Sequence, residues 1–500
     1  MAAAVLWSVA ACQAGADAPH AGHEAAGVDF GVHCAPAVRK DFDGALALLH
    51  HMTYPQARAA FRSIAQRDPK CAMAHWGVAM TLFQPLWPTR PDLEDRKLGG
   101  EEVQHARAIG TSDPRERMFI DAAAAFFENP ASEDYWARIH RWADATERAH
   151  EAFPQDVDTT TFEALALLAT TPQDRATRDN ADHAAALLLP VLKAHPDHPG
   201  AMHYLVHADD VPGREHDNAD VVRRYEEEAP DNPHALHMPT HVYTREGDWA
   251  GVVRGNLRAA DAALRYPAGD HGEYVWDEFP HAIEYLVYAY LQQGDVANAK
   301  KQRDRLLATQ HLQPSFKTAF HLASVQARIP LETQDWAAAA ALQPRTPAWV
   351  DWDKYAWPEA IAQFAHGVGA EHLGHREDAL AALKRMMALR DKMVAAKESL
   401  FERNIHVLQL ELEGVIAHAN GYDRNAIEKL QAAAAIEAAT PKHPVTPGPT
   451  LPSEEMLGQL YLLRHEGALA KAAFERSLAL YPNRLASRRG LAAAQALLQR

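Results

Sequence analysis

Apolar residues recur along this chain with the spacing of helices and not with the spacing of strands. Alanine-rich runs at residues 122–125 and 337–341 favour helix and let neighbouring helices pack closely. Valine-rich segments that alternate apolar and polar residues, which are typical of half-buried strands, do not stand out. The pattern therefore predicts an all-α protein with no substantial sheet.

The C-terminal part of the sequence contains a recurring pattern of Gly, Ala and Pro. Gly367 and Ala379 are twelve residues apart, as are Gly414 and Ala426. The clearest unit places small residues where helices cross, aromatic residues in the gaps and a proline after the second helix: Leu457, Gly458, Tyr461, Ala470, Phe474, Ser477 and Pro482. This is the spacing of the tetratricopeptide repeat (TPR), a helix–turn–helix unit. We predict a right-handed α-solenoid of about seven to nine degenerate TPR-like helix pairs.

The repeat pattern also suggests boundaries along the chain. We interpret residues 1–29 as a signal and lipobox segment with a flexible linker, and residues 30–195 as N-terminal TPR-like repeats. Residues 196–330 form central repeats with a His-rich concave site, and residues 331–500 form C-terminal TPR repeats. Because intervals between repeats exceed the simple period, we expect insertions at residues 85–100, 171–180, 211–217, 266–278 and 441–452.

Composition and charge narrow the class of protein. The chain has 500 residues, of which 47% are hydrophobic and 23% charged, as in globular proteins. Its net charge is −16, and no cluster of Lys and Arg stands out. Nucleic acid is therefore not an expected partner.

The N-terminus resembles an export signal. A short apolar run ends in Val9-Ala10-Ala11-Cys12, a small-residue run before a cysteine that is similar to a bacterial lipobox. We predict lipidation of Cys12 and an exported protein, periplasmic or anchored in the bacterial envelope. The run is too short to span a bilayer, so we expect contact with the membrane only through the lipid anchor.

Two cysteines remain once Cys12 is set aside. In an exported protein, an even pair such as Cys34 and Cys71 predicts a disulfide. Two buried thiols are the alternative in a cytosolic protein. A disulfide would tie the leading segment to an early repeat helix.

Histidine provides the main functional clue, with 29 residues in the chain. His203 and His207 are separated by four positions, and so are His237 and His241. A spacing of four places two side chains on one face of a helix. The second pair follows the first at an interval that equals the TPR period, about 34 residues. We therefore expect the four imidazoles on adjacent first helices, facing one cavity on the concave surface.

Further residues complete the predicted site. We expect His281 or Glu284 to join the four imidazoles from the next unit as metal ligands, and His234 to share their face. Asp210, Asp277 and Tyr285 are expected as ligand-binding or ligand-orienting neighbours. Such a set of nitrogen and oxygen atoms suits Zn, Cu, Fe or Ni without distinguishing them. His50, His51 and His75 are a weaker extension, because aromatic residues surround them.

Two other interpretations of the histidines remain open. They are either imidazoles that bind an anionic or peptide ligand, or hydrogen-bonded packing residues set against Tyr204, Tyr243 and Trp249. No Gly-rich phosphate loop, H-E-x-x-H or G-x-S-x-G motif is present, so any catalysis must use the histidine groove. Whether the protein is an enzyme stays open.

Several segments resemble a group of exported bacterial TPR proteins. The most specific are HYLVHA at residues 203–208 and HALHMPTHVY at residues 234–243, and the others are CAMAHWG at 71–77 and PNR at 482–484. The resemblance runs from about residue 30 to the end and implies the fold and export more than an activity. In that group a second pair of histidines usually follows the central block. Here His281 is the first histidine of such a pair, but Glu284 and Tyr285 stand where the second histidine is expected.

The sequence thus supports two functional hypotheses. The first is an exported solenoid whose His-rich site binds a transition metal, for binding a small molecule or for a metal-dependent reaction. The second is a TPR adaptor whose groove docks a peptide or an envelope protein, with the histidines as polar contacts.

Overall fold

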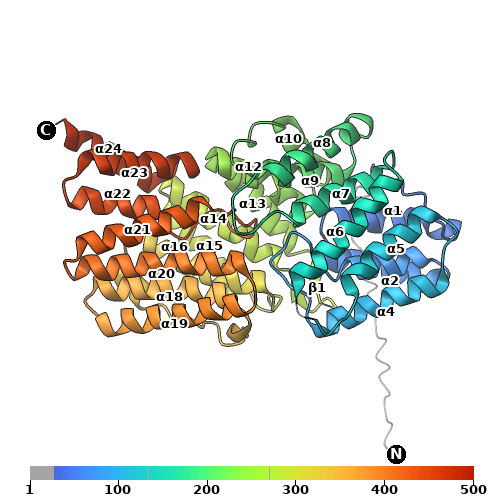
Figure 1. The fold of residues 1–500 in the computed structure, drawn as a ribbon, viewed down its shortest axis with the longest axis horizontal. Helices are drawn as coiled ribbons and strands as arrows, with labels where there is room; N and C mark the ends of the chain where they lie inside the picture. Colours follow the sequence, from blue (N-terminus) through green and yellow to red (C-terminus); the bar gives the residue numbers. More distant parts are fainter. Residues whose placement is uncertain (1–26, 133, 270, 500) are drawn as a thin grey trace, which may run out of the picture.

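A computed structural model of the chain describes residues 27–132, 134–269 and 271–499. Cys12 and the predicted export segment lie outside these residues. The described chain is almost entirely helical (Figure 1). Its strand structure is limited to β1 (Pro267–Ala268) paired antiparallel with β2 (Tyr274–Val275), and one bridge from Val275 to Leu312. The all-α prediction is confirmed.

The helices follow one another in a continuous series. The N-terminal part contains α1 (Pro36–His50), α2 (Tyr54–Arg67), α3 (Ala72–Met80), α4 (Leu93–Ile109), α5 (Pro114–Phe127), α6 (Tyr135–Ala152), α7 (Val157–Ala169) and α8 (Asp179–Ala194). The central part contains α9 (Pro199–Asp209), α10 (Ala219–Glu228), α11 (Pro233–His237), α12 (Pro239–Glu246), α13 (Trp249–Ala263), α14 (Glu278–Gln293), α15 (Val296–Ala308), α16 (Phe316–Thr333) and α17 (Trp336–Ala340). The C-terminal part contains a 3-10 turn, η1 (Trp352–Lys354), and α18 (Ala356–His372), α19 (Arg376–Ala395), α20 (Ser399–Ala419), α21 (Asp423–Ala438), α22 (Ser453–Leu463), α23 (Gly467–Leu480) and α24 (Leu485–Leu498).

Neighbouring helices pack as pairs, which makes the fold an α-solenoid of TPR-like units. If α11 and α12 count as one interrupted helix, the pairs are α1/α2, α3/α4, α5/α6, α7/α8, α9/α10, α11–12/α13, α14/α15, α16/α17, α18/α19, α20/α21 and α22/α23. These eleven pairs in the described chain exceed the seven to nine expected. The additional pairs lie mostly in the N-terminal half, where the Gly–Ala–Pro pattern is too degenerate to count from sequence.

Local sequence signals explain where many helices begin and end. The side chain of Asn232 accepts hydrogen bonds from two backbone N–H groups at the start of α11, and Asp248 caps α13 in the same way. Gly247 and Gly294 end α12 and α14 in the left-handed conformation, which glycine adopts without strain. The turns between α12 and α13 and between α14 and α15 are therefore short and defined.

The hydrophobic core is continuous along the solenoid. One cluster of buried residues runs from Val28 to Ala289, a second from Leu236 to Ala362 and a third from Phe316 to Val445. Their overlap means that each unit is buried by its neighbours, as expected of a repeat array. No boundary between separate cores divides the described chain at the central repeats.

Both ends of the solenoid contact its centre. Helix α1 packs on α9, and α24 packs on α14. At the C-terminal end, the indole N–H of Trp249 donates to the carbonyl of Asn483, and the backbone N–H of Leu485 donates to Gln292. The central first helices are therefore covered by parts of the chain that are far away in sequence.

The predicted insertions largely match the long connections. Loops separate α7 from α8, α9 from α10, α13 from α14, and α21 from α22. The first insertion is shorter than expected, because α4 already begins at Leu93. The acidic side chain of Asp92 forms a capping box there, which starts the helix earlier than the Gly99-Gly100 pair suggests.

Cys34 and Cys71 are joined by a disulfide. Their Cα atoms are 4.8 Å apart, within the bridging range that was expected. The bond ties the segment before α1 to the start of α3. None of the helices in the described part of the chain combines the length and apolarity that crossing a bilayer requires.

Candidate metal centre

The candidate site lies on the first helices of three consecutive pairs. Helices α9 and α11 begin with Pro199 and Pro233, which are separated by the same interval as the two histidine pairs. His203 and His237 are the fifth residues counted from these prolines, and His207 and His241 are the ninth. The register that the sequence indicated is thus the register of the helices.

Three histidines form the first cluster, which we call triad A: His203, His207 and His234. Their potential ligand nitrogens all lie within 4.8 Å of one another. The Nε2 atoms of His203 and His234 are 3.1 Å apart, and the ring centres of His203 and His207 are 4.9 Å apart. His234, expected only as a ligand-binding neighbour, therefore lies as close to the other two imidazoles as a third ligand of one ion would.

Three further histidines form triad B: His237, His241 and His281, again with potential ligand nitrogens within 4.8 Å of one another. The Nε2 atoms of His237 and His241 are 2.9 Å apart, and the ring centres of His237 and His281 are 4.2 Å apart. Pro239 interrupts the helix between the first two residues and removes one backbone donor there. The pair still faces one point.

The two triads are neighbours. The ring centres of His207 and His241 are 6.1 Å apart, and those of His234 and His237 are 6.2 Å apart. We predicted one shared point for four imidazoles, and the structure corrects this to two adjacent points with three imidazoles each. The reason is that two further imidazoles join the four: His234 on α11 completes triad A, and His281 on α14 completes triad B.

Hydrogen bonds fix the ring tautomers in triad A. His203 Nδ1 lies 2.6 Å from the backbone carbonyl oxygen of His50, so it must donate. His234 Nδ1 lies 3.0 Å from Glu278, whose other carboxylate oxygen contacts the ammonium of Lys317. That ammonium keeps Glu278 an acceptor. In the neutral ring of each histidine, Nε2 therefore carries a lone pair and no proton.

The same argument holds for triad B. His237 Nδ1 lies 2.7 Å from Asn256 Oδ1, and the Asn256 amide nitrogen donates to Thr240 and to the carbonyl of Val252, which fixes the amide orientation. His241 Nδ1 donates to Asp210 at 2.9 Å. Both Nε2 atoms are thus unprotonated, and their lone pairs face each other across 2.9 Å.

His281 is oriented by a relay that starts at a carboxylate. His321 on α16 donates from Nδ1 to Glu284 at 2.5 Å, so its Nε2 is an acceptor. His281 Nδ1 lies 3.1 Å from that Nε2 and donates to it. The remaining nitrogen of His281 is therefore also a lone-pair donor.

Facing lone pairs at these distances are an arrangement that a shared cation would stabilise. Two neutral imidazoles with unprotonated Nε2 atoms 2.9–3.1 Å apart repel each other, because neither can donate a hydrogen bond. Ligand nitrogens bound to one ion at about 2.0–2.1 Å, at angles of about 90–110°, are about 2.8–3.4 Å apart. The observed separations fall in this range.

Burial keeps the rings neutral. It is the largest cause lowering the pKa of His203, His207, His234, His237 and His281 well below 6.5. Burial also lowers the pKa of His241, although Asp210 opposes the shift. Neutral imidazole is the form that binds metal, so all six rings are available as ligands near neutral pH.

The predicted acidic ligands lie behind the imidazoles and not among them. Glu284 accepts hydrogen bonds from His321, Ser324 and Arg328, which corrects the prediction of a direct ligand. Burial favours its neutral form, but His321 and Arg328 outweigh this and lower its pKa. Asp277 is bound by Ser315 and lies 3.4 Å from Lys317, so it supports Glu278 only indirectly.

Asp210 and Tyr285 do contact triad B. Asp210 is an ion-pair partner of Arg245 and Lys442 as well as the acceptor for His241. Burial acts to raise its pKa, but these neighbours outweigh burial and lower it well below 3.8. The ring of Tyr285 stands edge-on to His237, with ring centres 4.6 Å apart, and its hydroxyl donates to the carbonyl of Pro444.

Sequence reasoning missed several of the orienting groups. The steps along the chain from His237 to His281 and from His281 to His321 are both longer than the TPR period, so neither follows the repeat register. Glu278 and Asn256 sit on α14 and α13 and carry no motif of their own. Their roles depend on which helices are adjacent, which sequence spacing does not reveal.

The early histidines lie around the site and not in it. The carbonyl of His50 orients His203, and a Cβ on Gly200 would meet His50 Nδ1 at 2.4 Å, so glycine permits this approach of α9. His51 contacts the hydroxyl of Tyr225. His75 pairs with Glu102 elsewhere on the N-terminal units.

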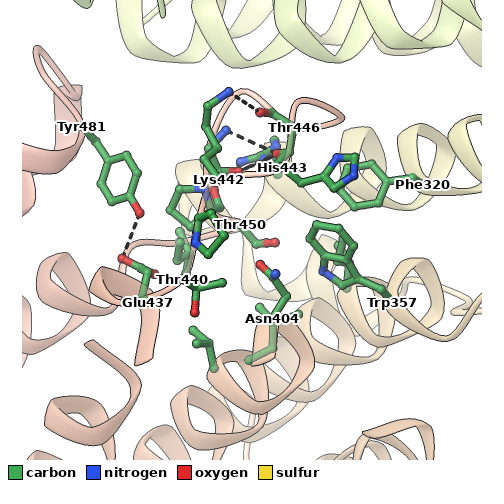
Figure 2. Close-up of a pocket in the computed structure, with 18 residues that line it drawn as sticks. Phe320, Trp357, Asn404, Glu437, Thr440, Lys442, His443, Thr446, Thr450 and Tyr481 are labelled. Carbon is green, nitrogen blue, oxygen red and sulfur yellow. Dashed lines mark hydrogen bonds between the residues drawn. The ribbon is translucent and has the colours of Figure 1, made fainter. Parts of the chain in front are cut away.

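The site is enclosed, which differs from the open groove we expected. The six rings are 0–7% exposed. The loop between α21 and α22 covers them: Lys442 donates to Asp210, and Arg328 donates to the carbonyls of Gly448 and Pro449. Part of this loop also lines a cavity of about 70 Å³, together with Phe320 and Trp357. Figure 2 shows Phe320 beside His443, with Trp357 below them.

Comparisons with known proteins add little to this geometry. No family model matches the chain, and no curated protein matches it. Among solved structures, the human IFIT1 dimer with m7Gppp-AAAA is 13% identical with a TM-score of 0.41, covering 86% of this chain and 90% of that one. The APC/C hetero-tetramer Cut9-Hcn1 is 11% identical with a TM-score of 0.32, covering 91% of this chain and 89% of that one. We base no functional argument on similarity at this level.

Proposed function

We propose that this solenoid binds two transition-metal ions, one in triad A and one in triad B. The observation that carries the proposal is the pair of short Nε2–Nε2 contacts, 3.1 Å for His203 and His234 and 2.9 Å for His237 and His241, between rings whose Nδ1 atoms donate elsewhere. Packing histidines would place a donor against an acceptor at such a contact. Here both partners are acceptors, as in ligands of one ion.

The ions that we propose are first-row transition-metal ions. Neutral imidazole suits Zn, Cu, Fe and Ni, and Cu²⁺, which has the highest affinity for a given site in this series, is the ion to test first. Asp210 and Glu278 accept hydrogen bonds from His241 and His234 of the site, and Glu284 accepts one from His321, which orients His281. They supply negative charge around the ions and increase the basicity of the ligands.

The burial of the rings argues against the adaptor hypothesis. A peptide docked through imidazole contacts needs side chains that reach the solvent, and these rings are at most 7% exposed. The enclosed site suits an ion and a small molecule better than an envelope protein.

Export remains part of the proposal. Val9-Ala10-Ala11-Cys12 would direct the chain to the bacterial envelope with a lipid on Cys12. The disulfide between Cys34 and Cys71 is in keeping with an oxidising compartment. A fusion of residues 1–30 to a reporter tests this, and Cys12→Ser should block lipid labelling; a reporter that stays cytoplasmic contradicts it.

Metal analysis tests the central proposal. Protein purified without a histidine tag and reconstituted with Cu²⁺ or Zn²⁺ should hold two ions per chain by elemental analysis after gel filtration. The double variant His207→Ala/His241→Ala should lose the metal and keep the helical circular dichroism. A wild-type protein that retains no ion, or a double variant that unfolds, would show that the histidines are packing residues.

A further inference from the structure

A cavity of about 310 Å³ reaches the metal centre from one side. His207 of triad A and Asp210 form part of its wall. Its volume is at the lower end of the range for small-molecule sites, about 300–1,000 Å³. The structure holds a built cavity next to one ligand of the proposed centre.

The wall of the cavity is formed by both halves of the chain. Pro85, Trp87 and Tyr135 come from the N-terminal units, and Pro441, Lys442 and Pro444 come from the loop between α21 and α22. The halves are joined at this place: the N–H of Ala176 donates to the carbonyl of Ala439, and Arg90 pairs with Glu398. The cavity is therefore a fixed feature of the folded chain.

Aromatic and aliphatic side chains make up much of the lining. Trp87, Tyr135 and Trp136 supply aromatic surface, and Leu168, Ala169 and Val211 supply aliphatic surface. The guanidinium of Arg90 lies 3.9 Å from the ring centre of Tyr135 and is occupied by Glu398. A flat, apolar ligand fits such a lining better than a sugar or a peptide backbone.

The charges beside His207 favour an anionic group on that ligand. Two cations, Arg245 and Lys442, surround one carboxylate, Asp210, which leaves one positive charge in excess at this wall. Lys442 donates to Asp210 at 2.9 Å and to the carbonyl of Thr446 at 3.4 Å. The ammonium has a third N–H, which has no acceptor among the described residues.

His207 links this charged wall to the metal centre. Its Nε2 is buried and has no hydrogen-bond partner among the described residues. Arg245 and Lys442 both contact Asp210, which in turn holds His241 of triad B. An oxygen placed near Lys442 therefore lies beside Asp210, the partner of His241, in the cavity that His207 lines.

We propose that this cavity binds a small aromatic molecule with an anionic oxygen, a carboxylate or a phenolate, directed at Lys442 and at the ion held by His207. The proposal rests on the proposed function for the contact with the ion, and on the cavity lining for the aromatic ring. An ion held by the three imidazoles of triad A would accept a further oxygen ligand, which an anionic group in this cavity would supply.

Calorimetric titrations of the full chain, metal-free and reconstituted with Cu²⁺, test this with two matched pairs of probes. Benzoate is compared with benzamide, and 4-nitrophenolate at pH 8.5 with nitrobenzene, because each pair differs mainly in the charge on the polar group. At least one anion should bind with a Kd below about 1 mM and about tenfold or more tightly than its neutral partner. Metal loading should tighten that anion by about fivefold or more, and the anion that responds identifies the carboxylate or the phenolate.

Thr171→Phe, which fills the cavity from its partly exposed loop, should weaken binding about tenfold, and Gln173→Trp provides a second filling variant. Arg175→Phe alters the same loop at an exposed residue outside the lining and should leave binding unchanged. Three outcomes would overturn the proposal: neither anion binds, the neutral partners bind equally well, or neither filling variant weakens binding in folded protein.

The metal-free titration separates this proposal from the proposed function. If the chain takes up no metal, the proposed function fails, whereas the metal-free titration still tests whether the cavity binds the anion.

Discussion

The Nε2 atoms of His203 and His234 lie 3.1 Å apart while the Nδ1 atom of each ring is directed at an oxygen acceptor. Both rings belong to triad A, and neither can donate to the other in its neutral form. We therefore expect His234→Ala to reduce the metal content from two ions per chain to one, because triad B keeps its three imidazoles. Elemental analysis measures the change directly.

His183→Ala is the matched control for that experiment. His183 is exposed on α8 and outside both triads, so this variant should retain two ions. Loss of both ions in His234→Ala would show that the triads do not fill independently, and no loss would remove His234 from the ligand set.

Disrupting the hydrogen-bond relay from Glu284 through His321 to His281 should weaken metal binding less than removing a ligand does. His321→Phe preserves the ring volume but removes the acceptor for His281 Nδ1, so His281 loses its fixed tautomer. We expect metal affinity at triad B to fall by about 10–100-fold with the stoichiometry unchanged. Competition titration with a chelator of known affinity provides the measurement.

Ser324→Ala separates the relay from the general packing around Glu284. It removes another partner of Glu284 but leaves the contact of 2.5 Å between Glu284 and His321. Its affinity should stay closer to wild type than that of His321→Phe. Equal losses in the two variants would argue against a specific role for the relay.

Metal removal should destabilise the central repeats. An ion that binds only the folded chain contributes about 4.1 kcal/mol when its free concentration is 1,000 times its Kd. We therefore expect treatment with a chelator to lower the midpoint of thermal unfolding, and re-addition of Cu²⁺ to restore it. The His207→Ala/His241→Ala variant should show no response to either treatment, and a response of the same size would place the ion elsewhere.

Removing the disulfide should destabilise the N-terminal units. It closes a loop of 37 residues between Cys34 and Cys71, and a loop of this length is worth about 3–4 kcal/mol. The variant Cys34→Ser/Cys71→Ser should lose roughly that much in free energy of unfolding of the first units, measured with denaturant and intrinsic fluorescence. The metal content should be unchanged, since both residues lie outside the triads.

Sequence patterns predicted the fold and the centre of the site better than its surroundings. The repeat interval between the two histidine pairs places them correctly because α9 and α11 begin at prolines with the same interval. Glu284 was predicted from its position near His281, but its side chain turns to His321 and Arg328. The cover formed by the loop after α21 depends on how far the solenoid curves, which no local pattern encodes.

Two buried carboxyl groups in the C-terminal units, Glu411 and Glu437, predict how stability depends on pH. Burial is the main cause that raises the pKa of both, that of Glu437 to about 7, and the negative charge of Glu437 raises the pKa of Glu411 further. Both groups share Ser453, whose hydroxyl lies 2.7 Å from Glu411 and 3.3 Å from Glu437. The folded state therefore holds protons that the unfolded chain, with carboxyl pKa values near 4.5, releases.

This difference in bound protons determines whether stability rises or falls with pH. A pKa that is raised on folding contributes stability below the unfolded value, and this contribution is lost as pH rises through the folded value. We expect the free energy of unfolding of these units to fall as pH rises from about 4.5 through about 7. Glu411→Gln keeps an acceptor for Ser453 and cannot ionise, so it should be about as stable as wild type at pH 5 and more stable than wild type at pH 8. Glu413→Gln, at a partly exposed residue paired with Lys429, serves as the control and should not flatten the profile. A Glu411→Gln profile that falls with pH as steeply as wild type would mean that this pair is ionised in the folded protein.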